Sequence, residues 1–128
     1  MLLTSQRESL PLYMPVNIKR IYDDAKRTDG YRILVDRLWP RGIKKADADI
    51  DLWLKEIAPS AELRKWFHSG EGEWAAFKKK YKAELKGSDA LKELHALAKE
   101  HKILTLLYAS KDEEHNHALI LQQLFGKK

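Results

Sequence analysis

The stretch LVDRLWPRGIKK, residues 34–45, carries the side chains best suited to chemistry in this sequence. An apolar run ends there in Asp36, Arg37 and Arg41, with Trp39 between the two arginines. The planar guanidinium of arginine binds a phosphate or carboxylate group through two parallel hydrogen bonds. We therefore expect Arg37 and Arg41 to bind an anionic ligand, with Asp36 orienting them or acting as a base.

A structural role for these residues is the alternative. Asp36 would then form an ion pair with Arg37, Arg41 or Arg64, and Trp39 would pack in the core. Trp39 lies outside any helical stripe, so it is also suited to stacking on a ligand ring or closing a pocket. The sequence leaves both interpretations open.

A second polar stretch, SKDEEHNHA at residues 110–118, follows the strand predicted at 102–110. Ligands of parallel α/β sheets gather outside the carboxyl ends of the strands, so Tyr108 and Asn116 are expected to line the same pocket as the arginines. His115 and His117 would project roughly 200° apart on a helix and cannot share one ion there. No metal site is predicted.

The composition excludes several classes of function. The 128 residues include no cysteine, which excludes disulfides, thiolate metal ligands and thiol catalysis and is typical of the cytoplasm. No apolar stretch approaches the roughly 20 residues that cross a bilayer, so no membrane association is expected. The phosphate-loop, dinucleotide-binding and nucleophile-elbow patterns are absent, so no cofactor is predicted and no reaction class follows.

The formal net charge of +5 is concentrated in one segment. Residues 17–45 hold nine Lys or Arg and four Asp or Glu, whereas residues 46–128 hold fourteen of each. A localised excess favours an anionic ligand such as a nucleotide or a phosphorylated metabolite. The alternative is a nucleic-acid-associated or protein-interaction accessory protein that uses this segment with Lys78–Lys82. The oligomeric state is not indicated.

The elements that must position these residues indicate an α/β fold. Strands are predicted at 16–23, 31–39 and 102–110, and helices at 50–57, from Ser60, at 74–85, from Ser88 and from Asp112. Strands separated by helical segments predict one α/β domain, residues 16–128, with a small, mostly parallel sheet flanked by several helices. Residues 1–15 are expected to form a loose extension, with Met14 as an alternative start.

Several motifs together resemble a known family. They are RIYD, DGYRILVDRLWPRGIKK, WLKEIAPSAELRKWFH, WAAFKKKYKAEL and TLLYASKDEEHNHALIL. Over residues 18–124 the chain resembles the YeaO-like group of the domain-of-unknown-function 488 family. This resemblance implies a small cytoplasmic bacterial α/β protein and supplies no substrate. Family members outside that group carry a Cys-His-Arg element near the last strand–helix junction, where this chain has EHNHA, so a thiol-based role does not transfer.

Overall fold

The apolar segment predicted at 102–110 supplies the central strand of the sheet in the computed structural model, which describes residues 16–126. This strand, β4 (Leu104–Tyr108), lies between β1 (Val16–Arg20) and β2 (Tyr31–Leu34), and β3 (Leu52–Trp53) pairs with β2 at the edge. All three pairings are parallel. The α/β prediction is therefore confirmed, with one strand more than the sequence indicated.

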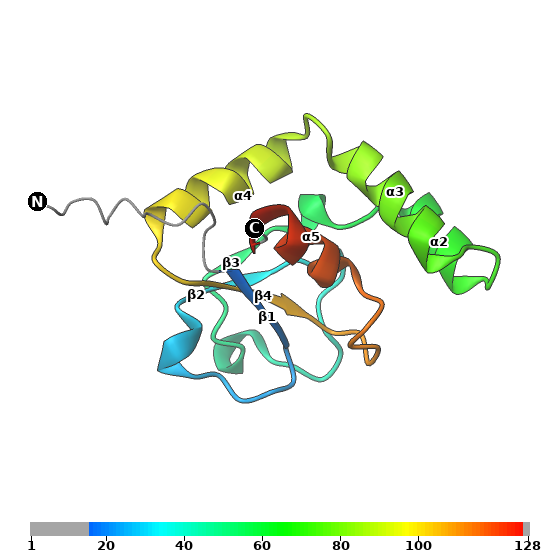
Figure 1. Cartoon of the computed structure of the whole chain (residues 1–128). Helices are drawn as coiled ribbons and strands as arrows, with labels where there is room; N and C mark the ends of the chain where they lie inside the picture. Colours follow the sequence, from blue (N-terminus) through cyan, green and yellow to red (C-terminus); the bar gives the residue numbers. More distant parts are fainter. Residues whose placement is uncertain (1–15, 127–128) are drawn as a thin grey trace, which may run out of the picture.

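The α-helices and one 3₁₀ helix cover one face of this sheet, and loops with the other two 3₁₀ helices cover the opposite face (Figure 1). The four α-helices among the described residues are α2 (Ala61–His68), α3 (Trp74–Leu85), α4 (Asp89–Glu100) and α5 (His117–Gly126). The 3₁₀ helices are η1 (Arg27–Asp29), η2 (Lys45–Asp47) and η3 (Lys55–Ile57).

Each face of the sheet has its own apolar cluster, because side chains alternate along a strand. On β4, Leu106 points into the larger cluster beneath the helices and Leu107 into the smaller cluster on the loop side. Phe77, Tyr81 and Leu85 form the buried stripe of α3, as predicted. The Tyr81 hydroxyl donates to the carbonyl oxygen of Ile57 at 2.6 Å, which satisfies the one polar atom of this otherwise apolar stripe.

Serine caps fix the starts of α2 and α4. The backbone N–H of Leu63 donates to the Ser60 hydroxyl, and that of Leu91 donates to the Ser88 hydroxyl, each at 3.1 Å. Both starts agree with the prediction, because Ser at the N-cap accepts from a backbone donor that has no partner in the first turn.

The helix predicted at 50–57 is wrong. The segment instead forms β3 and η3, and the backbone N–H of Leu54 donates to the carbonyl oxygen of Leu34 at 2.9 Å. Its four apolar residues do not share one face: Leu54 and Ile57 pack beneath the helices, whereas Ile50 and Trp53 pack on the loop side. Pairing with β2 thus outweighed a helical spacing that this short segment matched.

Two further predictions concern the ends of the chain and membranes. The predicted extension at 1–15 and residues 127–128 lie outside the described residues. Within residues 16–126, no helix combines the length and the apolar character needed to cross a membrane.

Candidate functional site

A cavity of about 310 Å³ opens where β2 and β4 end, and we call it the arginine cavity. The segments after these strands form part of its wall, and helices α2 and α3 with the start of α5 form the rest. Three guanidinium groups and one carboxylate are its charged lining groups, so the wall carries a positive excess. The lining residues are those of segments 36–41, 58–59, 109–110 and 115–117, with Tyr22, Arg64, Phe67, His68 and Phe77.

Asp36 connects the ends of the strands at this cavity. Its Oδ2 accepts from the backbone N–H of Ala109 at 2.9 Å, and its carbonyl oxygen accepts from Trp53 Nε1 at 2.8 Å. Its Oδ1 is buried and has no hydrogen-bond partner among residues 16–126, although His117 Nε2 lies 3.2 Å away. That ring nitrogen lies closer to the carbonyl oxygen of Val35, at 2.9 Å. Asp36 therefore keeps one acceptor free.

Two arginines of the wall keep unused donors. Arg37 donates through Nη2 to the carbonyl oxygen of Ala58 at 3.1 Å, which joins the end of β2 to the segment before α2. The Nε atoms of Arg37 and Arg64 are buried and have no acceptor within the described part of the chain. Arg37, Arg41 and Arg64 form no ion pair with Asp36 in that part either, so this half of the structural alternative is not found, whereas Trp39 does pack against the apolar cluster on the loop side. A buried donor without an acceptor costs about 1–3 kcal/mol, which an anionic ligand would recover.

Trp39 and Arg41 lie on a loop that is held in place by its own contacts. Trp39 Nε1 donates to the carbonyl oxygen of Ile43 at 2.6 Å, and the Trp39 ring packs edge-on against Trp53 at 5.3 Å between centroids. The carbonyl oxygen of Arg41 accepts from the Tyr22 hydroxyl at 2.8 Å. The Arg41 side chain is exposed, which places its charge on the solvent side of the cavity.

Asn116 lines the cavity and also caps α5. Its Oδ1 accepts from the backbone N–H of Leu119, and its Nδ2 donates to the carbonyl oxygen of Asp112, each at 2.9 Å. The helix begins at His117 and not near Asp112 as predicted, because Asp112 accepts from the backbone of Glu114 and closes a turn instead. The backbone N–H groups of Glu114 and, to a smaller extent, of His115 donate to the Asp112 carboxylate and lower its pKa. Residues 112–114 thus lie in the turn before the helix.

Tyr108 does not line the cavity, which corrects the prediction. Its side chain is 3% exposed and packs in the cluster beneath the helices, on the same face as Leu104 and Leu106. Burial, followed by the charge of Glu113, raises its pKa. The prediction placed Tyr108 at the correct end of β4 but did not account for the alternation of side chains, which turns this one into the buried cluster beneath the helices.

The structure therefore brings together most of the residues that the sequence singled out, namely Asp36, Arg37, Trp39, Arg41 and Asn116. Their binding role stays a prediction. Sequence reasoning gave no ligand role to Arg64, Phe67 and His68, which line the cavity from α2. Their spacing of three and four residues on a helix capped at Ser60 was the available signal, because such residues share one helix face.

Metal binding finds no support in the described residues. No group of three or more His, Asp or Glu side chains there is arranged to hold an ion. His115 is exposed and contacts the Trp74 ring edge-on at 5.1 Å, whereas His117 points to the backbone of Val35.

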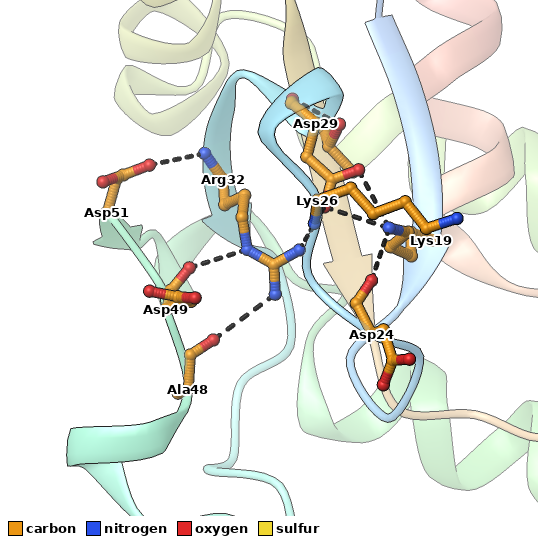
Figure 2. A network of polar contacts seen from close by, with 9 residues as sticks. Lys19, Asp24, Lys26, Asp29, Arg32, Ala48, Asp49 and Asp51 are labelled. Carbon is orange, nitrogen blue, oxygen red and sulfur yellow. Dashed lines mark hydrogen bonds and ion pairs between the residues drawn. The ribbon is translucent and has the colours of Figure 1, made fainter.

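A second charged cluster lies on the loop-covered face of the sheet, and we call Lys19, Asp29 and Arg32 the buried ion network (Figure 2). Lys19 Nζ lies 2.9 Å from Asp29 Oδ1, and Arg32 Nη1 donates to Asp29 Oδ2. Burial raises the pKa of Asp29, but the bonds from Lys19, Lys26 and Arg32 outweigh it and the net pKa is lowered. Two basic residues of segment 17–45 thus share one carboxylate inside the fold.

Comparison with known proteins places the chain among bacterial relatives. Residues 15–128 match the family model described as the inactive DUF488-N3 subclade. Uncharacterized protein YeaO of Escherichia coli is 53% identical over 109 residues, which cover 84% of this chain and 94% of that protein. Uncharacterized proteins of Mycobacterium tuberculosis and Mycobacterium bovis are each 40% identical over 111 residues, covering 87% of this chain and 93% of theirs. No solved structure gives a significant match.

Proposed function

The chain belongs to the inactive DUF488-N3 subclade, and from this premise we propose that it is a binding protein whose arginine cavity holds a small anionic molecule. The observation that carries the proposal is the buried Nε of Arg37 and of Arg64, each without an acceptor in the described residues. A phosphate or carboxylate oxygen supplies the missing acceptor and a compensating charge.

The charges of the wall support an anion over a neutral ligand. Arg37, Arg41 and Arg64 line the cavity together with a single carboxylate, that of Asp36. In a partly enclosed site the effective dielectric constant is lower than in water, so these guanidinium groups attract an anion more strongly than surface lysines do. Phosphate esters and carboxylates are the two ligand classes that match this wall.

Binding without turnover agrees with the composition and with the subclade. The sequence has no cysteine, so a thiol step is excluded, and one oxygen of Asp36 is already held by the backbone N–H of Ala109. We propose a cytoplasmic location, because a chain without cysteine needs no oxidising compartment to form disulfides.

Thermal unfolding with a ligand panel tests the proposal. The panel contains phosphate esters, nucleotides, carboxylates and a short DNA duplex, each measured with the wild type and with Arg64→Ala. A ligand at about a hundred times its dissociation constant stabilises the folded state by roughly 2.7 kcal/mol. We expect a small anion to raise the melting temperature of the wild type and to have a much weaker effect on Arg64→Ala.

Arg27→Ala is the matched control, because Arg27 is an exposed arginine of η1 that does not line the cavity. It should keep the full ligand response. A panel in which no small anion stabilises the wild type would contradict the proposal. Stabilisation by DNA alone would instead favour the nucleic-acid alternative.

A further inference from the structure

The arginine cavity has an aromatic wall beside its charged one, and this pairing narrows the class of ligand. On the basis of the anion site proposed above, we propose further that the occupant is a nucleoside monophosphate. Its phosphate would lie at Arg37 and Arg64, and its base would lie against the rings of Phe67 and His68. Three properties of the wall lead to this class.

The first property is the position of the rings relative to the charge. Arg64, Phe67 and His68 line the cavity from α2, and one helical turn of about 5.4 Å separates the arginine from the rings. The Phe67 ring packs on Phe77 of α3 with 4.5 Å between centroids, so its position is fixed. A ligand bound to Arg64 through its phosphate must therefore extend an apolar or planar group across this wall.

The second property is the free acceptor of Asp36. Its Oδ1 is buried at the same cavity without a hydrogen bond among the described residues, because His117 Nε2, 3.2 Å away, lies closer to the carbonyl oxygen of Val35. A bare dianion would place two negative groups together there, whereas a ligand with both an anionic group and an O–H or N–H donor satisfies both kinds of free atom. The ribose hydroxyls and the N–H groups of a nucleotide supply such donors.

The third property is the net charge of the cavity wall together with the cavity volume. Three guanidinium groups and one carboxylate leave an excess of two positive charges, and a phosphate monoester carries about −1.5 to −2 at pH 7. The volume of about 310 Å³ is at the small end of small-molecule sites, which suits one nucleotide better than a longer chain. A sugar phosphate would match the charge but would supply no base to lie against Phe67 and His68.

Calorimetric titration of the wild type with inorganic phosphate, ribose 5-phosphate, the four nucleoside monophosphates and the four nucleosides tests this inference. Stacking of one base is worth enough to make a monophosphate at least about fivefold tighter than ribose 5-phosphate. Phe67→Leu keeps an apolar side chain without the ring, and it should bring the monophosphate down to the affinity of ribose 5-phosphate. His68→Ala, at an exposed position, should act in the same direction with less effect on folding.

Asp36→Asn tests the donor requirement. The asparagine oxygen can still accept from Ala109, so its amino group would replace the free acceptor with a donor. We expect the monophosphate to bind about tenfold more weakly and inorganic phosphate to bind no more weakly than before.

The outcomes separate this inference from the anion site. Equal affinities for ribose 5-phosphate and every monophosphate would overturn the nucleotide assignment and leave the anion site standing. A tight monophosphate that is insensitive to both Phe67→Leu and His68→Ala would also overturn it. If no phosphate compound binds, the nucleotide assignment falls, and the anion site falls with it unless a carboxylate of the thermal-unfolding panel stabilises the wild type.

Discussion

The buried ion network and the arginine cavity both combine aspartate with arginine, but the fold completes only the first. In the network, Arg32 donates through Nε to Asp49, through Nη1 to Asp29 and through Nη2 to Ala48, so each of its nitrogens has an acceptor (Figure 2). In the cavity, one oxygen of Asp36 and the Nε of Arg37 and Arg64 lack a partner within residues 16–126.

This difference separates a structural cluster from a candidate binding site. A buried charged group lowers the stability of the folded state unless its hydrogen bonds are made. Unsatisfied buried polar groups are therefore expected mainly at functional sites. The network ties β1, η1 and β2 together, and each guanidinium nitrogen of Arg32 in it already has an acceptor. The cavity, in contrast, has two donors and one acceptor without partners in the described residues. It lies at the carboxyl end of the sheet, where ligands of parallel α/β proteins usually bind.

Asp29→Asn should have the largest effect, because it removes the one carboxylate that pairs with both Lys19 and Arg32. Loss of one partner from a buried ion pair costs about 3–5 kcal/mol. Urea unfolding of the variant should show a loss of this size, while the exposed neighbour Asp24→Asn should stay within about 0.5 kcal/mol of the wild type. A loss below about 1 kcal/mol would show that the network is not structural.

Arg64→Ala should show the reverse pattern, with little loss of stability and a large loss of binding. The substitution removes a buried donor that has no partner in the described residues, so the free energy of unfolding should change by less than about 1 kcal/mol. A charge-assisted bond to the ligand is worth about 1.5–3 kcal/mol, so the affinity for a bound anion should fall roughly 10- to 150-fold. Titration of this variant and of Arg27→Ala measures the difference. A strongly destabilised Arg64→Ala would make the cavity a second structural cluster.

The sequence predicted the cavity better than it predicted the network, for a physical reason. The apolar run before Asp36 and the one before Ser110 both end in polar residues, and parallel strands bring such ends to one edge of a sheet. The network depends on Asp29, which precedes β2, and on Arg32 and Lys19, which point to the loop face. A charged residue inside a strand looks exposed in a sequence until its partner is known.

The errors have the same origin in tertiary contacts. Residues 50–57 have helical spacing, yet the backbone pairs with β2 and sends Trp53 and Leu54 to opposite faces. Tyr108 was predicted from its place at the end of β4, but the side on which it lies depends on the register of the whole strand. Local signals with a direct chemical cause, such as the caps at Ser60 and Ser88, were predicted correctly.

Lowering the pH should reduce the stabilisation that the buried ion network provides, because Asp29 becomes protonated. Its pKa is lower in the folded state than its usual value of 3.8, so the folded state binds fewer protons in that range. The resulting stabilisation is fully present above the usual value and is lost as the pH falls through the folded-state pKa. Urea unfolding between about pH 6 and pH 2.5 should show the wild type and Asp29→Asn approaching each other as the pH falls. Arg64→Ala, with its network intact, should keep the wild-type slope, and parallel curves for wild type and Asp29→Asn would contradict the assignment.

Lys79→Glu should have the smallest effect. It tests whether the lysines on α3, and not the arginine cavity, form the binding site. Lys79 is exposed on α3 and does not line the cavity, so reversal of its charge should change stability by less than about 0.5 kcal/mol. The affinity for a small anion should also stay unchanged, because at about 0.15 M salt charges more than about 8 Å apart are largely screened. If the α3 lysines instead contact nucleic acid, the variant should bind DNA more weakly, and its dependence of log affinity on log salt should be shallower by about 0.9. If Lys79→Glu weakens DNA binding and leaves nucleotide binding unchanged, the functional site would be the surface of α3 and not the arginine cavity.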